Sequence, residues 1–460
     1  MMNYSETLDF LYSRLPAYHR IGRAAYRNNL DNTLALDAYF GHPHRNYLSV
    51  HIAGTNGKGS VSHMLASILM EAGYKTGLYT SPHLKDFRER IRINGKMIPK
   101  GRVVSFVRNH RGIIETVQPS FFELTAAMAF DYFSREGVDV SVIETGMGGR
   151  LDSTNIITPV LSVITNIGHD HADLLGDTPE KIAAEKAGII KTNIPVVIGE
   201  TQSETMEIFC ESARASHSRI FFADRHYRCT ATVDSADPEL RYYTVERPAG
   251  GEAFTGEDPC NRGNALTSVN PPTSGNPSAA VKRVNVAVPL VGDYQVRNIQ
   301  TVFQACECLS DSLAIDEKAV VGGLRKVVSN TGFSGRWQIL QKRPLVIADT
   351  GHNREGIEYV VRQIGKMNAE RIHFVLGFTG DKDLSLVLPL FPVNAFYYFT
   401  RASVSRALDE KLLQKEALRY GLRGESYGTV ADAWKAALDN AAADDIIFIG
   451  GSTFVVADVL

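Results

Sequence analysis

The 460-residue chain has little of several features that mark specialised proteins. Its five cysteines are few and odd in number, and Cys306 and Cys308 are too close together for the usual zinc-ligand spacing. No apolar run approaches the roughly 18 residues of a membrane span, and Met1 to Pro16 lack the charged and apolar blocks of a signal peptide. We therefore expect a cytoplasmic protein with reduced thiols and no membrane partner. These features leave the oligomeric state open, for which a monomer is our expectation.

The chain also lacks an excess of either charge, because 49 Lys and Arg face 51 Asp and Glu and leave a formal charge of −2. A dedicated nucleic-acid binder usually has a strong basic excess, so we expect no nucleic-acid partner. Hydrophobic residues make up 44% and charged residues 22%, which is ordinary for a globular protein with a sizeable core.

Short apolar stretches rich in Val and Ile alternate with helical segments along most of the chain. The stretches that we interpret as strands are 47–53, 75–80, 138–144, 160–166 and 195–199, then 345–348, 372–376, 396–399 and 446–450. Helices are predicted at 61–72 (amphipathic and ended by Gly73), 294–305, 356–367 and 405–420. This alternation predicts an α/β fold in which helices cover both faces of mostly parallel sheets.

We expect two unequal domains, since a domain typically has roughly 100–200 residues. The large one spans 1–333, a hinge lies at 334–337, and a smaller α/β, Rossmann-like domain spans 338–460. Residues 248–279 are mostly Gly, Pro, Ser, Asn or Thr, and we interpret them as a mobile surface insertion between two strands. A binding lid is the less favoured alternative.

The strongest local signal is a glycine-rich segment between a predicted strand and a predicted helix. It reads Gly54-Thr55-Asn56-Gly57-Lys58-Gly59-Ser60. Such a loop brings backbone N–H groups and a helix N-terminus to phosphate oxygens, while Lys58 would contact the outer phosphates and Ser60 would reach a bound Mg²⁺. The spacing differs from the common phosphate-loop (P-loop) pattern, and a generic glycine-rich turn is the alternative. We favour binding of a nucleoside triphosphate by the large domain.

Further segments follow the loop in a fixed order along the chain. They are Thr80-Ser-Pro-His-Leu84, Phe87-x-Glu-Arg-Ile91, Glu144-Thr-Gly-Met-Gly-Gly-Arg-Leu-Asp-Ser-Thr-Asn155, Thr165-Asn-Ile-Gly-His-Asp-His171, Glu185-Lys-Ala-Gly-Ile-Ile190, Gly335-Arg336 and Asp349-Thr-Gly-His-Asn353. In this combination the sequence resembles folylpolyglutamate synthase and dihydrofolate synthase, which belong to the ATP-dependent amide ligases that include the muramyl ligases. Muramyl ligases usually carry an extra N-terminal domain, for which a loop at Gly54 leaves no room.

The resemblance implies a Mur-ligase-like fold and a defined chemistry. A carboxylate of dihydropteroate or of a folate would attack the γ-phosphate of ATP, and L-glutamate would displace phosphate from the resulting acyl phosphate. Phosphoryl transfer depends on positioning and on charge neutralisation, which ATP-bound Mg²⁺ at two sites would supply. Which of the acids is used is left open by the sequence, so the enzyme is either monofunctional or bifunctional.

The resemblance also implies metal ligands. These are Ser60, Ser81, Glu144, His171 and Lys186, of which Lys186 would be carbamylated, and the same Glu144, His171 and Lys186 form the catalytic set with Lys58. From the residues alone, Glu144 could cap a turn or pair with Arg150. His171 could be structural, Ser81 could belong to an ordinary Ser-Pro turn, and Lys186 could lie on a solvated helix face.

The remaining implied contacts concern the nucleotide and the acid. Gln295 and Asn298, spaced i and i+3 on one helix, would contact adenine, and Arg336, Asp349 and His352 would lie on the ATP side of the second domain. The acid would contact Phe121, Phe122, Glu123, Arg150 and Asp152. From the residues alone, Glu123 is better explained as a charge at a helix start that the helix dipole stabilises. Helix capping or buried polar packing explains Gln295 and Asn298 about equally well, and core packing does so for the two aromatics.

Three other classes of protein fit less of the sequence. A muramyl-type ligase is disfavoured, because this sequence leaves no room for the N-terminal domain that such ligases usually carry. A regulatory ATP-binding protein would need the P-loop but has no reason to keep Ser81, Glu144, His171 and Lys186. A dinucleotide-binding protein fits poorly, because the Lys58 and Ser60 loop suits a triphosphate.

Overall fold

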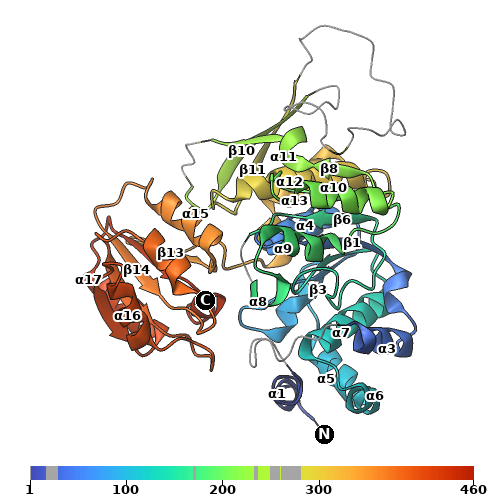
Figure 1. Ribbon diagram of the computed structural model, residues 1–460, viewed down its shortest axis with the longest axis horizontal. Coiled ribbons are helices and arrows are strands. Elements are labelled where there is room, and N and C mark those ends of the chain that lie inside the picture. Colours follow the sequence, from blue (N-terminus) through green and yellow to red (C-terminus); the bar gives the residue numbers. More distant parts are fainter. Residues whose placement is uncertain (1, 17–28, 169–171, 233–236, 249–259, 261–280) are drawn as a thin grey trace.

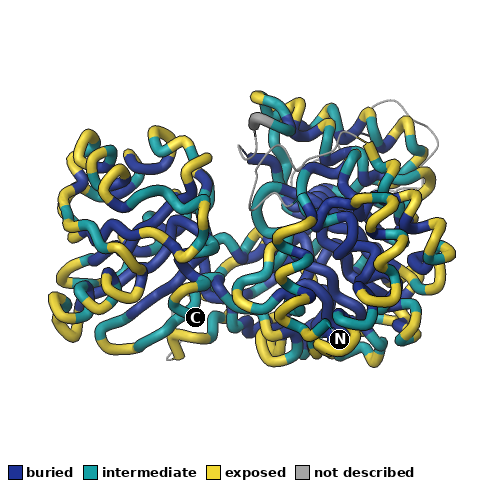
Figure 2. The backbone as a smooth tube through the Cα atoms, turned by 90° about the horizontal axis from the view of Figure 1, so that it is seen from below, coloured by how far each residue is buried: buried dark blue, intermediate teal, exposed yellow. Residues whose placement is uncertain are grey.

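The computed structural model describes residues 2–16, 29–168, 172–232, 237–248, 260 and 281–460. The chain forms two α/β lobes, with the first sheet and its helices in the larger lobe and the last hundred or so residues in the smaller one (Figure 1). In both lobes the most buried backbone lies in the centre, where the strands run (Figure 2). The predicted boundary at 334–337 lies between the two sheets and remains a prediction.

An eight-stranded sheet in the order β4-β3-β2-β5-β1-β6-β7-β8 organises the larger lobe. The pairs from β2 to β8 are parallel, whereas β3 and β4 are antiparallel additions. The strands are β1 (Leu48–Ala53), β2 (Thr76–Tyr79), β3 (Ile91–Ile93), β4 (Lys96–Met97), β5 (Val140–Glu144), β6 (Leu161–Ile164), β7 (Val196–Ile198) and β8 (Ile220–Phe222). The five strands predicted for this region are confirmed as β1, β2, β5, β6 and β7.

Helix α4 (Lys58–Glu71) follows β1 directly and is buried on every face from Ser60 to Leu69. The sequence predicted an amphipathic helix here, which is wrong because a second layer of helices covers the outer side of α4. This layer consists of α12 (Gln295–Leu309), α13 (Glu317–Arg325) and α14 (Val327–Thr331). Helix α4 ends as predicted, since Gly73 adopts the left-handed conformation with φ +92°.

Further helices of this lobe surround the sheet and the segments that lead to the site. They are α1 (Tyr4–Arg14), α3 (Asp31–Tyr39), η2 (Pro43–Asn46), η3 (Phe87–Arg90), α5 (Lys100–Asn109), α6 (Arg111–Val117), α7 (Phe121–Glu136), α8 (Ala172–Leu175), α9 (Pro179–Ala187), α10 (Met206–Ala215) and α11 (Ala223–His226). None of the helices in the described part of the chain is long and apolar enough to cross a membrane.

A three-stranded antiparallel sheet packs on this lobe, of which the sequence predicted only that two strands flank the 248–279 insertion. It contains β9 (Arg228–Ala231), β10 (Arg241–Pro248) and β11 (Val281–Val288), and Pro248 pairs with Val281. The predicted insertion at 248–279 therefore connects two paired strands, as expected. Apart from Pro248 and Cys260, it lies outside the described residues.

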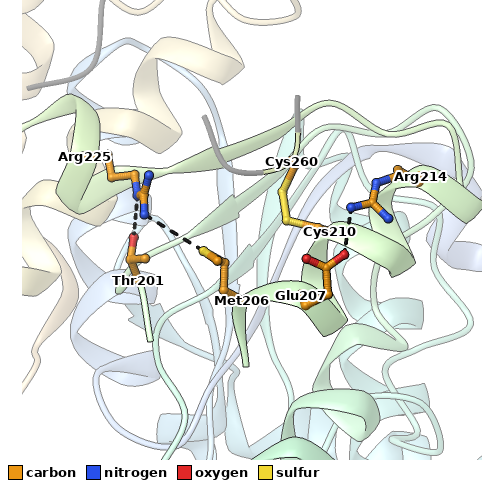
Figure 3. The surroundings of a disulfide bond; sticks show 7 residues. All are labelled: Thr201, Met206, Glu207, Cys210, Arg214, Arg225 and Cys260. Carbon is orange, nitrogen blue, oxygen red and sulfur yellow. Dashed lines mark hydrogen bonds and ion pairs between the residues drawn. A yellow bond between two sulfur atoms is a disulfide. The ribbon is translucent and has the colours of Figure 1, made fainter. Parts of the chain in front are cut away.

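The expectation of reduced thiols is wrong for two cysteines. Cys210 on α10 and Cys260 form a disulfide with a Cα–Cα distance of 5.2 Å (Figure 3). Their separation of 50 residues carries no sequence signal. Cys229, Cys306 and Cys308 are buried free thiols.

The smaller lobe contains a six-stranded sheet in the order β12-β13-β17-β14-β15-β16, in which only β12 is antiparallel. Its strands are β12 (Gln338–Lys342), β13 (Leu345–Asp349), β14 (Ile372–Leu376), β15 (Phe396–Thr400), β16 (Gly424–Tyr427) and β17 (Ile446–Gly450). All four predicted strands are confirmed. The helices are α15 (Arg354–Ile364), η5 (Leu384–Leu386), η6 (Leu388–Leu390), α16 (Glu410–Leu418), α17 (Val430–Asn440) and α18 (Thr453–Ala457). Helix α16 begins five residues later than predicted, because Asp409 caps its N-terminus.

Candidate active site

A cavity of about 380 Å³ collects side chains from both lobes. The carboxyl ends of β2, β5, β1 and β6 lie side by side at one edge of the large sheet, so the loops that follow these strands reach the same wall. Loops after β13, β14 and β17 form the wall on the smaller lobe. Residues predicted from the sequence that line this cavity are Thr55, Asn56, Gly57, Lys58, Gly59, Ser60, Ser81, Phe121, Phe122, Glu123, Glu144, Asp152, Asn298, Arg336, Asp349 and His352.

The glycine-rich loop has the strained backbone that only glycine tolerates. Gly57 has φ +86°, and a Cβ there would lie 2.3 Å from Oδ1 of Asn298. Gly54 has φ +146°, and a Cβ there would lie 1.9 Å from Oγ1 of Thr165. The Lys58 ammonium donates hydrogen bonds to the carbonyl oxygens of Gly54 (2.9 Å) and Thr55 (3.2 Å), so it is folded back over the loop.

Glu144 ends β5 in a buried position with 3% exposure. Its Oε2 accepts a hydrogen bond from the Ser81 backbone N–H (3.2 Å), and a Cβ added to Gly59 would lie 4.0 Å from the same oxygen. Burial raises the pKa of Glu144 to about 7, against the opposing effects of Lys58, the Ser81 amide and the Arg336 guanidinium. The alternative pairing with Arg150 does not occur.

The first turn of α12 covers the start of α4. Asn298 donates from Nδ2 to Oε1 of Gln295 (2.7 Å), and Gln295 donates from Nε2 to the Ser60 hydroxyl (3.3 Å). Asn298 borders the cavity, whereas Gln295 is fully buried behind the loop. This arrangement agrees with buried polar packing for Gln295 and leaves adenine contact open to Asn298.

Lys186 on α9 is buried with 3% exposure, so the solvated-face alternative is wrong. Its Nζ donates to the Gly54 carbonyl oxygen (3.0 Å), which places it directly behind the P-loop. His171, predicted as a metal ligand, lies outside the described residues and stays a prediction. Carbamylation of Lys186 also stays a prediction.

An aromatic wall faces the Glu144 side of the cavity. Phe121 and Phe122 begin α7, and the Phe122 ring lies so close to Gly146 that a Cβ there would be 2.4 Å from it. Glu123 is the third residue of a capping box: its carboxylate accepts from the Ser120 backbone N–H (2.5 Å), while its own N–H donates to the Ser120 hydroxyl. Glu123 therefore lies in the first turn of α7, which agrees with its interpretation as a charge at a helix start, and it also borders the cavity.

Asp152 and Arg150 belong to the loop after β5 but have different surroundings. The Asp152 carboxylate accepts from the Met147 N–H (2.8 Å) and from the Thr154 N–H (3.0 Å), which fixes the loop beneath the cavity. Burial raises the pKa of Asp152. Arg150 forms a 2.7 Å ion pair with Glu185 and points away from the cavity, so the structure does not bring it to the predicted substrate position.

The Asp349 carboxylate connects the predicted hinge, at Trp337, to the loop after β13. Asp349 accepts hydrogen bonds from the Tyr294 hydroxyl, the Trp337 backbone N–H and the Gly351 backbone N–H, each at 2.7 Å. The Nδ1–H of His352 donates a hydrogen bond to the Thr350 carbonyl oxygen (2.9 Å), and both His352 and Arg336 line the cavity.

Several cavity residues were missed by the sequence analysis. Lys382 and Arg406 give the smaller lobe a basic wall. Asn353 does not line the cavity itself, but it donates across the lobes to Oδ1 of Asn56 (3.0 Å), which does. Arg90 borders the cavity on the opposite side. Asn353 and Arg90 stand within the motifs quoted above and could have been found there, whereas Lys382 and Arg406 stand in loops without a pattern.

The fold and this cavity define a class: a nucleotide-binding α/β protein whose P-loop faces a second α/β unit. Two family models match the chain, the Mur ligase middle domain over residues 52–306 and the Mur ligase glutamate ligase domain over residues 335–453. The Bacillus subtilis dihydrofolate synthase/folylpolyglutamate synthase is 32% identical, with 88% of each chain covered. Among solved structures, Escherichia coli FolC in complex with DHPP and ADP has a TM-score of 0.78 at 26% identity and covers 100% of this chain and 97% of its own.

The chain belongs to the Mur ligase family, in the group of folylpolyglutamate and dihydrofolate synthases, and it is an ATP-dependent ligase. A Haloferax volcanii relative, a "probable bifunctional folylpolyglutamate synthase/dihydropteroate synthase", is 32% identical over 99% of this chain. The present chain spans about half of the length of that relative, 50%.

Proposed function

We propose that the protein joins L-glutamate to dihydropteroate, to folates, or to both, through an acyl phosphate formed at the expense of ATP. The observation that carries the proposal is one cavity with three chemically different walls. A triphosphate would fit the wall formed by the P-loop and Glu144. A flat aromatic acid would fit the wall formed by Phe121 and Phe122, and the basic wall would fit an amine that carries carboxylate groups. The E. coli structure, which holds DHPP and ADP together, supports the same combination of ligands.

The proposed reaction has two steps, phosphoryl transfer to the acid and attack of the amine. A carboxylate oxygen bonds to the γ-phosphorus while the bond from that phosphorus to the bridging oxygen breaks, and ADP leaves. The amine of L-glutamate then attacks the acyl carbon, phosphate departs, and the amine loses a proton. Backbone N–H groups of the loop and Lys58 offset the negative charge of the phosphates, since positioning and charge dominate phosphoryl transfer.

The residues around Glu144 fit Mg²⁺. Magnesium prefers oxygen ligands, and the Glu144 carboxylate together with the Ser60 and Ser81 hydroxyls supplies them at the mouth of the P-loop. Among the described residues, no Lys or Arg lies within ion-pair distance of this buried carboxylate, so a cation would supply the missing charge. When bound, the ion would neutralise phosphate charge as the γ-phosphoryl group moves.

The basic wall positions the second substrate. Lys382 and Arg406 lie on the smaller lobe, opposite the P-loop, and Ser452 and Thr453 at the end of β17 add hydroxyl donors. We propose that these groups bind the two carboxylates of L-glutamate and leave its amine facing the acyl phosphate. Neutral amino acids would then be poor substrates, because they lack the second carboxylate that these groups would bind.

The test is ADP release by the full chain with Mg²⁺, ATP and L-glutamate, run in parallel with dihydropteroate and with tetrahydrofolate. Release with one acid identifies the substrate, and release with both shows a bifunctional enzyme. Mass spectrometry should show a product heavier by one glutamyl residue, and the Lys58→Ala protein should form none. Release with neither acid, while ATP still binds, would overturn the folate proposal in favour of another acid.

A further inference from the structure

Arg90 is a buried cation beside the phosphate-binding edge of the sheet. It ends η3 directly before β3, and its carbonyl oxygen accepts from the Thr80 backbone N–H (3.1 Å), next to Ser81. Arg90 is only 5% exposed, and it borders the cavity. The sequence motif that contains Arg90 has no role in the mechanism described so far.

The contacts of the Arg90 side chain hold it in place without neutralising it. Its Nε donates to Nδ1 of His83 (2.8 Å), and its guanidinium carbon lies 5.1 Å from the centre of the Phe121 ring. The neighbouring Glu89 is not its partner, because that carboxylate accepts from three backbone N–H groups at residues 84–86. In the described part of the chain, no carboxylate forms an ion pair with Arg90.

Arg88, two residues earlier, shows the usual arrangement by contrast. Its guanidinium forms a 2.7 Å ion pair with Asp86, and both side chains are partly exposed. A buried charge is costly unless it is paired, and burial lowers the pKa of Arg90. The cavity therefore contains a desolvated cation that has no ion-pair partner among the described residues. The charges of Glu144 and Glu89 act on it only from beyond ion-pair distance.

The position of Arg90 indicates where that counter-charge enters. Its guanidinium lies against Phe121 of the aromatic wall, while its backbone adjoins Ser81, whose N–H contacts Glu144. An aromatic acid with its ring on this wall and its carboxylate directed at the γ-phosphate would bring the carboxylate to Arg90. The guanidinium can donate two hydrogen bonds to one carboxylate.

We infer that Arg90 binds the carboxylate of the acid that is to be activated. The inference rests on the proposed function for the identity of the acid. In the phosphoryl-transfer step, one carboxylate oxygen bonds to the γ-phosphorus as the bond to the departing ADP oxygen breaks. The other oxygen becomes the acyl carbonyl and keeps its hydrogen bond from Arg90, so the acid is held through activation and the later attack by the amine.

Equilibrium binding of dihydropteroate and of its carboxamide tests this role directly. Both ligands carry the same rings, so only the charge and hydrogen bonding at the carboxyl group differ. The wild-type protein should bind the acid about tenfold to a hundredfold more tightly than the amide. The Arg90→Met protein should bind both about equally, whereas Arg88→Gln, the matched control, should keep the preference.

Thermal unfolding separates recognition from a structural role. Without ligand, Arg90→Met should unfold at the same temperature as wild type or higher, because it removes an unpaired buried cation. Dihydropteroate should stabilise wild type but not the variant. If Arg90→Met fails to fold, Arg90→Lys replaces it in the binding measurement. We expect Arg90→Lys to fold and to show a weaker preference for the acid over the amide.

Two results would overturn the inference: equal binding of acid and amide by wild type, or an unchanged preference in both Arg90 variants. A failure to fold in both variants would assign Arg90 to stability and would also overturn it. Failure of the proposed activity looks different. In that case the wild-type chain would release no ADP with L-glutamate, yet the preference for the acid would still depend on Arg90.

Discussion

Replacing Glu144 with Gln should stabilise the ligand-free protein at neutral pH while abolishing its activity. Burial raises the pKa of Glu144 from 4.5 to about 7, so between these values the folded protein binds a proton that the unfolded chain has released. Stability therefore falls as the pH rises through this window, and the loss is complete above pH 7. The gap between the two pKa values corresponds to about 3 kcal/mol. The amide of E144Q keeps the shape and carries no such cost.

Urea unfolding of both proteins between pH 5 and pH 8 measures this difference without Mg²⁺ or ATP. The advantage of E144Q in unfolding free energy should be small at the acid end and grow toward about 3 kcal/mol at the alkaline end. Added Mg²⁺ and ATP should then stabilise wild type above pH 7 more than E144Q, because the carboxylate gains a cation. Parallel pH profiles for the two proteins would refute the reasoning.

Three further substitutions have distinct expected outcomes. Lys58→Ala should leave the circular dichroism spectrum unchanged and abolish ADP release; measurable turnover would remove Lys58 from the phosphate site. Gly57→Ala should lower the unfolding free energy by about 1–2 kcal/mol and raise the KM for ATP, because the added Cβ would collide with Asn298. Gly73→Ala is the control: its φ is similar but its surroundings are open, so it should lower the stability and leave the KM unchanged. Cys210→Ser should lower the unfolding free energy by about 2–4 kcal/mol and match the reduced wild type, with KM values unchanged; an altered KM would connect the disulfide to the site.

Much of the fold followed from periodicity in the sequence. Every predicted strand is present, because each is a short stretch rich in apolar residues, which is typical of strands buried on both faces. The burial of α4 on all sides was not predictable, since it depends on α12 to α14, which come more than 200 residues later in the chain. The sheet β9–β11 was not predicted beyond the two strands that flank 248–279, because its strands are partly exposed and contain many polar and charged residues.

The candidate site was predictable where a motif fixes the backbone. The glycine positions of the P-loop have the φ values and close contacts that such a loop needs, and Glu144 lies at the end of a strand beside it. The surroundings of side chains were less predictable. Arg150 pairs with Glu185 instead of lining the cavity. Lys186, predicted as a metal ligand with a solvated helix face as the alternative, is buried behind the loop, because helix α9 packs against the loop after β5.

The surroundings of residues that depend on contacts between distant segments were not predictable, even where, as for Arg90, a motif marked the position. Arg90 depends on Phe121 for its position, and Lys382 and Arg406 reach the cavity only because the second lobe faces the first. A local motif does not show which distant segments meet, so these contacts became visible only in the tertiary structure.

The central claim is that the acid is activated by transfer of the γ-phosphoryl group to its carboxylate. Dihydropteroate, or the folate that supports turnover, should therefore be prepared with ¹⁸O in the reacting carboxylate and incubated with the full chain, Mg²⁺, ATP and L-glutamate. Mass spectrometry of the released phosphate should find one ¹⁸O atom per amide bond formed, because the attacking oxygen leaves with the phosphate. Unlabelled phosphate, formed together with product, would contradict the acyl-phosphate mechanism.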